Sequence, residues 1–236
     1  MRALGRLTAD HPAWDIGPLS GSTRDQRDTL IASGQLFHAL ARDVISQVSG
    51  RNSPPSQVLQ LVTGGVIRTF VASETRRATI RYARSGDVIG LGTFLNPLHG
   101  AVSAEAVTDS DYFEFPAHVV QVLMLTDGAF ARTILHALLQ VQGTSMQRLL
   151  ENVFRPNRER VARHLLEMSH PGVDGSLDFT ATHQEIAEAI GSVREVVSRI
   201  IADFTAEGLL LRRGVGSTIT RPDLLRAIAD QGSRAE

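Results

Sequence analysis

Six consecutive residues, from Arg194 to Arg199, read Arg-Glu-Val-Val-Ser-Arg and combine forked donors, a carboxylate and a hydroxyl. In a helix, Glu195, Ser198 and Arg199 would share one face, because residues three and four positions apart are neighbours. Arginine can donate to guanine N7 and O6, glutamate can accept from cytosine N4, and an apolar group can touch the thymine methyl. Arg199, Glu195 and Val196 are the respective candidates, flanked by Arg194 and Ser198. The segment therefore predicts a surface that reads DNA bases.

Two short helices around a tight turn would position these side chains. Thr182 with Glu185, and Ser192 with Glu195, each have the spacing of a capping box, and Gly191 lies between them. Apolar residues recur at helical spacing in both segments: Ile186, Ala187 and Ile190, then Val197, Ile200, Ile201 and Phe204. The pattern predicts a helix-turn-helix whose second helix enters the major groove.

Phosphate contacts are expected on either side of that second helix. Gly208 ends the helix, and residues 209–220 read as a strand, a glycine-bearing turn and a second strand, which is a winged hairpin carrying Arg212 and Arg213. At the amino end of the first helix, Thr182, His183 and Gln184 are the further phosphate candidates. The alternative is an ordinary surface helix pair, in which Glu195 and Arg199 form an ion pair four residues apart. The caps, the turn and the hairpin together favour DNA binding.

The runs Gln184–Ala187 and Ile190–Arg199 resemble the signature of the Crp/Fnr superfamily of bacterial transcription regulators. Residues 86–90 resemble the turn between two β-roll strands of that family's sensor domain, and residues 157–168 resemble its hinge-proximal helix. The resemblance extends roughly from Leu36 to the wing. It implies an α+β fold with an amino-terminal antiparallel, jelly-roll-like β-roll sensor, a long dimerisation helix and a carboxy-terminal winged helix-turn-helix.

The same resemblance implies a cytoplasmic homodimer that binds double-stranded DNA at a pseudopalindrome with TGA and TCA cores. Arg199 would take the guanine and Glu195 the cytosine, while Ser198 or Arg194 would settle the outer bases or phosphates. Exposed β-roll loops of relatives contact RNA polymerase, which makes the polymerase an expected partner, but the sequence does not identify the residues responsible.

Composition excludes several kinds of site. The 236-residue chain has no Cys, which rules out disulfides, thiolate zinc sites and cysteine-ligated iron–sulfur clusters. Its net charge is −1, and residues 155–236 hold 11 Arg against 12 Asp and Glu, so charge alone is weak evidence for nucleic-acid binding. Dimeric readers can still bind through locally clustered arginines.

Other classes of protein find little support. The sequence has no phosphate-binding Gly-rich Lys motif, His-Glu-x-x-His helix, thiol or Gly-x-Ser-x-Gly elbow, so we do not expect an enzyme. No export signal is present, and the apolar run Val119–Leu125 is far shorter than the ~20 residues of a membrane span. A ligand-binding dimer that regulates proteins without touching DNA would leave Glu195, Ser198 and Arg199 unexplained.

Along the chain we expect a flexible leader at residues 1–22, a β-roll sensor at 23–125, a dimerisation helix at 126–154 and the winged domain at 155–236. Arg24–Leu40 is predicted to be helical, followed by strands at residues 58–62, 66–71 and 79–83. In the long helix, an a/d seam is formed by Leu135, Leu139, Gln142, Met146, Leu149 and Val153. The seam predicts a two-fold dimer, with packing on its own β-roll as the alternative, and Pro156 marks a hinge.

The effector is the least determined feature. Cyclic-nucleotide-binding members of the family carry a Glu after the turn glycine and a later Arg, but here Gly90 is followed by Leu91, and no Arg lies between Arg84 and Arg132. A cyclic phosphate would lose its bidentate contacts, so we expect weak or absent cyclic-AMP binding. If a ligand exists, its pocket is expected at Gly90, Leu91, Gly92, Thr93, Thr144 and Ser145.

No metal or other cofactor is expected. Haem could use His99, His118 or His136 as an axial ligand, but isolated histidines are more often surface residues. Two interpretations stay open: DNA binding without an effector, or a ligand- or haem-dependent regulator whose DNA binding requires an unknown effector.

Overall fold

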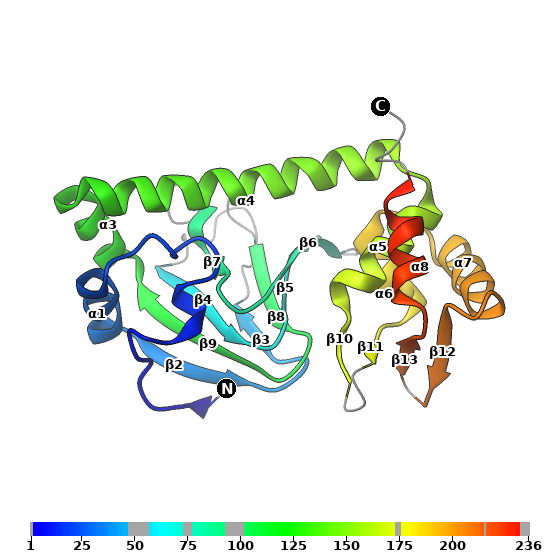
Figure 1. Cartoon of the computed structure of the whole chain (residues 1–236), viewed down its shortest axis with the longest axis horizontal. Coiled ribbons are helices and arrows are strands. Elements are labelled where there is room, and N and C mark those ends of the chain that lie inside the picture. The colour runs from blue at the N-terminus through cyan, green and yellow to red at the C-terminus, as the bar shows by residue number, and fades with distance from the viewer. Residues whose placement is uncertain are drawn as a thin grey trace. The chain divides into compact units, whose positions relative to one another are not determined.

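The computed structural model describes residues 2–46, 57–72, 77–92, 102–172, 176–214 and 216–231, with only the backbone at residues 72, 78, 145 and 147–153. The chain forms two compact units (Figure 1). The first comprises Met1–Ala72 and Arg81–Ser145, and the second comprises Ser73–Ile80 and Met146–Glu236. Sheets, helices and a carboxy-terminal helix-turn-helix confirm the α+β class.

Apart from the small carboxy-terminal sheet, the described strands form two sheets, ordered β1-β2-β9-β4-β7 and β3-β8-β5-β6. Their bounds are β1 Arg2–Ala3, β2 Gln35–Ala39, β3 Val44–Ser46, β4 Val58–Gly64, β5 Ile67–Ala72, β6 Arg77–Ala83, β7 Val88–Ile89, β8 Val102–Ala106 and β9 Ser110–Pro116. Neighbours such as β2 and β9, or β5 and β8, pair antiparallel. The strands expected at 58–62, 66–71 and 79–83 are therefore confirmed as β4, β5 and β6. Both ends of β5 lie one residue later than expected, and β4 and β6 are longer than expected.

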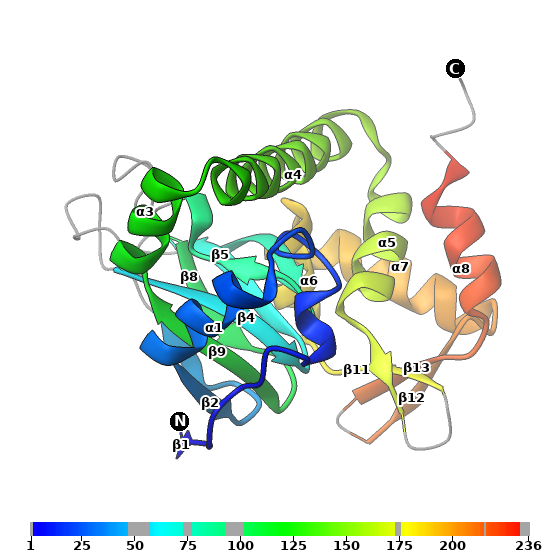
Figure 2. The ribbon, with the colours of Figure 1, turned by 60° about the vertical axis from the view of Figure 1, so that its left-hand side comes forward.

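The five-stranded sheet has a buried layer on each face, because side chains alternate along its strands. On one face, Val62 and Tyr112 pack with residues of the other sheet, including Ile67 and Ala104. The opposite face carries Leu59, Leu61, Phe113 and Phe115. It packs against three helices, which are α1 (Arg24–Ser33), α3 (Ala117–Thr126) and the first half of α4 (Gly128–Phe154) (Figure 2).

The helix expected over Arg24–Leu40 is wrong in its second half. α1 ends at Ser33, and the next residues form β2, which pairs with β9. Gly34 separates the two elements, and a Cβ atom there would collide with the Phe113 ring and the Glu114 carbonyl. The chain must pass so close to β9 at this point that it continues as a strand rather than as a helix.

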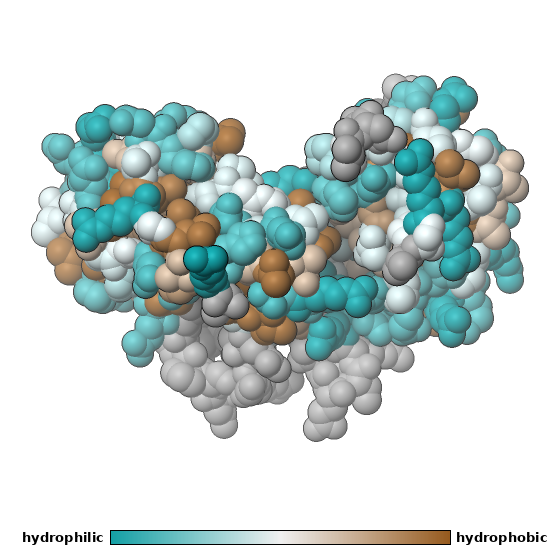
Figure 3. Space-filling view, turned by 90° about the horizontal axis from the view of Figure 1, so that it is seen from below, coloured by the Kyte–Doolittle hydropathy of each residue, from teal (hydrophilic) through white to brown (hydrophobic). Residues whose placement is uncertain are grey.

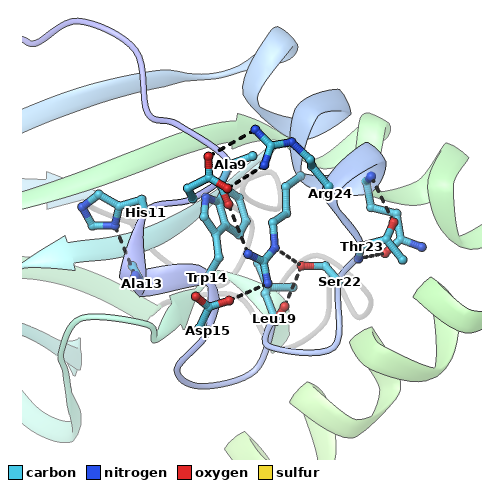
Figure 4. A network of polar contacts seen from close by, with 12 residues as sticks. Ala9, His11, Ala13, Trp14, Asp15, Leu19, Ser22, Thr23 and Arg24 are labelled. Carbon is cyan, nitrogen blue, oxygen red and sulfur yellow. Dashed lines mark hydrogen bonds and ion pairs between the residues drawn. The ribbon is translucent and has the colours of Figure 1, made fainter.

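The expected flexible leader is also wrong, because it is part of the core. The side chains of Trp14 and Leu19 are 0% and 1% exposed, and the 3₁₀ turn Pro12–Trp14 carries the Trp into the core cluster that includes Leu30 of α1 and Leu59 of β4. The Trp14 indole donates to the Thr8 carbonyl at 3.0 Å. Arg27 of α1 donates to the Ala9 carbonyl at 3.1 Å and to Asp15 at 2.8 Å (Figure 4). The Arg27 bonds hold the segment against α1, and the Trp14 ring packs against Phe113 of the first sheet.

The second unit contains the end of α4, four further helices and a small sheet ordered β10-β11-β13-β12 among the described strands. Their bounds are α5 Asn157–Met168, β10 His170–Pro171, β11 Leu177–Phe179, α6 His183–Ile190, α7 Arg194–Ala206, β12 Leu210–Arg213, β13 Gly216–Ile219 and α8 Pro222–Ala229. Pro156 separates α4 from α5, as expected of a residue that cannot continue a helix. None of the helices described is both long and apolar enough to span a membrane.

Candidate nucleic-acid interface

Helix α6 begins and ends as its sequence predicts. The Thr182 hydroxyl accepts from the Glu185 backbone N–H at 3.1 Å, and the Glu185 carboxylate accepts from the Thr182 N–H at 2.6 Å. At the other end, Gly191 is left-handed with φ 65°, and the Ser192 N–H donates to the Ala187 carbonyl at 2.8 Å. This glycine-based ending turns the chain sharply toward α7.

The start of α7 differs from the expectation. The helix begins at Arg194 with Val193 as its N-cap, and no side-chain capping bond is present, so the predicted capping box of Ser192 and Glu195 is wrong. The reason is that the Ser192 N–H already completes the end of α6, while Val193 takes the extended conformation of a cap residue. Helix α7 thus starts one residue later than the capping-box pattern predicts.

The two helices share an apolar core. Ile186, Ala187 and Ile190 of α6 are buried, and so are Val197, Ile200 and Phe204 of α7, whereas Ile201 is half-buried. Both helices also pack against α5, whose Val161, Ala162 and Leu165 are fully buried. The predicted core stripes are confirmed, which fixes the opposite side of α7 as the outward face.

That outward face carries charged side chains without partners. Arg194, Glu195 and Arg199 are exposed, and among the described residues no hydrogen bond or ion pair involves their side chains. In particular, Glu195 and Arg199 do not pair with each other, which removes the surface ion pair that was the alternative explanation for them. Val196 and Ser198 beside them are half-buried. The face has donors and an acceptor available for an external partner.

The wing lies next to α7 in the second unit (Figure 1). β12 and β13 pair antiparallel, with Arg212 opposite Ser217 and Arg213 opposite Gly216, and both arginines are exposed. Hydrophilic residues make up most of the face of this unit visible in Figure 3. The hairpin therefore presents cationic side chains from the same unit as α7, as the sequence predicts.

Residues 159–228, which include this helix-turn-helix and wing, match the model of the Crp-like helix-turn-helix domain. The chain thus contains a Crp-like helix-turn-helix domain. It is a transcription regulator with a helix-turn-helix DNA-binding domain. The family resemblance noted in the sequence is confirmed.

Known regulators are similar to this protein over most of its length. It is 29% identical over 173 residues to the transcriptional regulator SdrP of Thermus thermophilus, covering 71% of this chain and 80% of that protein. It is 28% identical over 181 residues to the global nitrogen regulator of Synechococcus elongatus, covering 72% and 79%. A solved structure from Eubacterium rectale, assigned to the crp/fnr family, has the same fold, with a TM-score of 0.73, 23% identity and coverage of 90% and 97%. Because the relatives are transcription regulators, the enzyme alternative is rejected.

The arginines of α5 and its preceding turn have a different role from those on α7. Arg160 donates to the carbonyl of Ile190, the last residue of α6, and burial lowers the pKa of its guanidinium. Arg155 and Arg163 donate to the carbonyl of Ala229, at the end of α8, at 2.7 and 2.9 Å. Cations at helix carboxyl termini are favourable because the last carbonyls carry partial negative charge. These guanidinium groups stabilise the ends of neighbouring helices.

Arg158 completes this set at the end of α7. Its guanidinium forms an ion pair with Glu207 at 2.6 Å and lies 4.6 Å from the centre of the Phe204 ring. The sequence prediction counted the arginines of residues 155–236 together. It did not distinguish those that bond to helix ends from those exposed on α7. The sequence does contain a signal for this difference, because the arginines at 155, 158, 160 and 163 alternate with the buried positions of an amphipathic helix.

The first-helix candidates are only partly available to phosphate. Thr182 is exposed but engaged in its capping box, and the Gln184 amide donates to Glu188 at 2.8 Å. His183 is half-buried, and its Nδ1 lies 2.8 Å from the Ser198 hydroxyl oxygen. One predicted phosphate contact and one predicted base contact are thus hydrogen-bonded to each other, which the sequence did not indicate.

The seam residues of α4 do not pack on their own chain where their side chains are described. Leu135, Leu139 and Met146 are 54%, 63% and 59% exposed, and Gln142 is exposed as well. The opposite side of the helix, with Phe130, Ile134 and Ala137, is buried in the first unit. The side chains of Leu149 and Val153 lie outside those described.

The residues expected to form an effector pocket differ in their burial and in their contacts. Leu91 is 1% exposed and belongs to the core beneath α4, so its side chain is not available to a ligand. Gly90 follows β7, with Gly92 two residues beyond it, and both are half-buried. Thr144 is exposed on α4 and donates to its own helix at the Gln140 carbonyl. Thr93 and the side chain of Ser145 lie outside the described residues.

The histidines considered for haem fall in two groups. His118 and His136 are exposed on α3 and α4, and His99 lies outside the described residues. Weak cyclic-AMP binding and the absence of haem therefore remain predictions.

Proposed function

We propose that this Crp/Fnr regulator is a homodimer that reads a pseudopalindromic DNA site with the outward face of α7. The observation that carries the proposal is the set of exposed side chains without internal partners, Arg194, Glu195 and Arg199. Three exposed charged side chains within six residues of one helix contribute little to the stability of the domain, but they are what base recognition requires. Arg199 would donate to guanine, Glu195 would accept from cytosine and Val196 would contact a thymine methyl.

The half-site proposed for this face contains TGA, with TCA on the opposite strand, as the family resemblance implies. Ser198 and Arg194 would contact the outer bases or adjacent phosphates. Positioning on the duplex would come from backbone N–H groups at the start of α6 and from Arg212 and Arg213 on the wing. Thr182, His183 and Gln184 supply the first-helix contacts in this proposal.

Dimerisation through α4 is supported by its exposed apolar side chains. Leu135, Leu139 and Met146 are all more than half exposed on a helix whose other side is already buried. An apolar seam of this kind is stabilised by burial against a second copy, and a two-fold dimer would present two recognition helices about 34 Å apart. RNA polymerase is a further proposed partner, and the cytoplasm is the proposed location.

Effector-free DNA binding is the form of the proposal that we favour. The turn after Gly90 offers the buried Leu91 where cyclic-nucleotide-binding members carry a Glu. The competing form, in which an unknown ligand or haem is required, predicts that purified protein selects no site until that effector is added.

Site selection from a random duplex library tests the proposal at one stated salt concentration. Purified protein without added ligand should enrich a two-fold TGA/TCA motif, and Arg199→Ala should lose the guanine preference while remaining a folded dimer. Enrichment of an unrelated half-site would contradict the base assignments. Absence of any enrichment from a folded dimer would contradict effector-free binding.

The dimer seam has its own test. Leu139→Glu should convert the dimer to monomer in sedimentation experiments, because it places a charge in the proposed interface. Leu125→Glu is the matched control, since Leu125 is 87% exposed on α3 and lies outside the seam. Dissociation of both variants, or of neither, would contradict α4 as the dimer helix.

A further inference from the structure

Ser198 differs from other hydroxyl residues within the helices of this protein. Thr144 and Thr205 donate to carbonyl groups of their own helices, at Gln140 and Ile201, with distances of 3.0 and 2.8 Å. The hydroxyl of Ser198 instead lies 2.8 Å from His183 Nδ1, fifteen residues away on α6. Among the described residues it has no other hydrogen-bond partner. Its orientation is therefore set by the neighbouring helix rather than by its own.

The second ring nitrogen of His183 forms no hydrogen bond with the described residues. It is the first residue of α6, directly after the Thr182 cap, and its ring is half-buried. Nδ1 is engaged with Ser198, whereas no described residue forms a hydrogen bond with Nε2. The backbone N–H groups of the first turn of α6 face the same helix end, where a DNA phosphate is expected under the proposed function.

The two ring nitrogens of a neutral histidine have opposite roles, since one donates and the other accepts. The hydrogen bond made by one nitrogen fixes the tautomer and thereby the role of the other. A phosphate oxygen can only accept, so contact with it requires a proton on Nε2. In the neutral ring Nδ1 is then an acceptor, and the Ser198 O–H donates to it.

We propose that His183 couples a phosphate contact to base reading by fixing the hydrogen-bond role of Ser198. With its proton directed at Nδ1, the Ser198 oxygen faces outward as an acceptor only. It would accept from an exocyclic amino group, which adenine carries at N6 and cytosine at N4 in the major groove. This inference rests on the proposed function, because it presupposes that α7 lies in the major groove.

The opposite arrangement has a distinct consequence. A doubly protonated ring, or a neutral ring with the proton on Nδ1, would donate to Ser198 and leave the serine proton free for guanine or thymine acceptors. Cytosine opposite Ser198 therefore reports that the serine accepts, and guanine or thymine reports that it donates, whereas adenine offers both an N6 donor and an N7 acceptor.

Site selection with four proteins tests the coupling: wild type, His183→Phe, Ser198→Ala and the double variant. The phenylalanine ring keeps the shape but removes both nitrogens. We expect His183→Phe to remove a preference of about 3- to 10-fold for adenine or cytosine at one position per half-site, the size of one neutral hydrogen bond. Ser198→Ala should change the same position, and the double variant should change it no further. The guanine preference of Arg199 should persist in all four.

Thr205→Ala is the matched control, because Thr205 is also a hydroxyl residue of α7 but donates to the Ile201 carbonyl of its own helix rather than to α6. It should leave the base preference at the Ser198 position unchanged. A uniform loss of affinity for all sequences in His183→Phe, or additive effects in the double variant, would overturn the coupling. Selection of guanine or thymine at that position by the wild type would also overturn it.

A direct measurement avoids dependence on variants. Long-range proton–nitrogen NMR of histidine-labelled protein bound to its selected duplex should show His183 neutral and protonated at Nε2. Protonation at Nδ1 would contradict the proposal even if every variant folds poorly. If the wild type, folded and dimeric, selects no site at all, the proposed function fails first, and this outcome is distinct from a selected site with no preference at the Ser198 position.

Discussion

Two groups of arginines lie within the same unit and are used in different ways. Arg155, Arg158, Arg160 and Arg163, on and just before α5, donate to carbonyls or a carboxylate of other helices. Arg194 and Arg199 on α7 have no side-chain partner among the described residues. A residue of one type thus stabilises the domain in one place and is left available for a ligand in another. The near-zero charge of this unit conceals an outward face of α7 on which two exposed arginines lie close together.

The largest effect that separates the groups is expected at Arg199. Arg199→Ala removes the forked donor, so the difference in binding free energy between the selected site and a site that lacks its guanine should fall by about 1–3 kcal/mol. The unfolding midpoint should not change, because no described residue bonds to this side chain. Competition binding and thermal unfolding measure the two quantities.

Arg160→Met should have the opposite effect, lowering the stability of the domain and leaving its base preference unchanged. It removes the donor from the Ile190 carbonyl at the end of α6, and a buried acceptor left unsatisfied costs about 1–3 kcal/mol. Denaturant unfolding should show this loss of stability, while the base preference of the folded fraction stays that of the wild type. A change in the selected half-site with unchanged stability would assign Arg160 to the reading group instead.

Removing an arginine from the wing should have a smaller effect on binding, and that effect should not depend on the DNA sequence. Arg212 is exposed on β12 and is proposed to meet phosphate. Arg212→Ala should weaken binding to the selected and the scrambled duplex alike. The slope of log binding constant against log salt concentration should become shallower by about one unit for the lost phosphate contact. Titrations at several salt concentrations measure that slope. A loss confined to the selected duplex would mean that the wing reads bases.

The smallest effect is expected at Arg158. Its ion pair with Glu207 is partly exposed, with 37% and 46% of the two side chains accessible, so the pair contributes about 0–1 kcal/mol. Glu207→Gln should therefore destabilise less than Arg158→Ala, which also removes the contact with the Phe204 ring. Equal losses of unfolding free energy would show that the ring contact contributes nothing.

Local rules predicted much of this molecule. The Thr182 capping box, the left-handed Gly191, the alternating strands and the break at Pro156 all depend on residues close together in sequence. The core stripes of α6 and α7 follow from helical spacing alone. These features placed the outward face of α7 without knowledge of the fold.

Features that depend on distant partners were missed. The leader is ordered because Trp14 packs near Phe113 and Arg27 bonds to Asp15, contacts that no local pattern reveals. Gly34 ends α1 because β9 lies against it, and Ser192 cannot cap α7 because its N–H completes α6. The roles of the α5 arginines likewise depend on which helix ends lie beside them. Sequence predicted the elements, and tertiary packing determined which polar groups remained free.

The central claim is that recognition resides in α7 while the α5 arginines only support it. The most direct measurement is the ratio of affinities for the selected and scrambled duplexes, determined at one salt concentration for wild type, Arg199→Ala and Arg160→Met. We predict that the ratio falls roughly 10- to 100-fold in Arg199→Ala and is unchanged in Arg160→Met. An unchanged ratio in Arg199→Ala, from a folded dimer, would contradict the account.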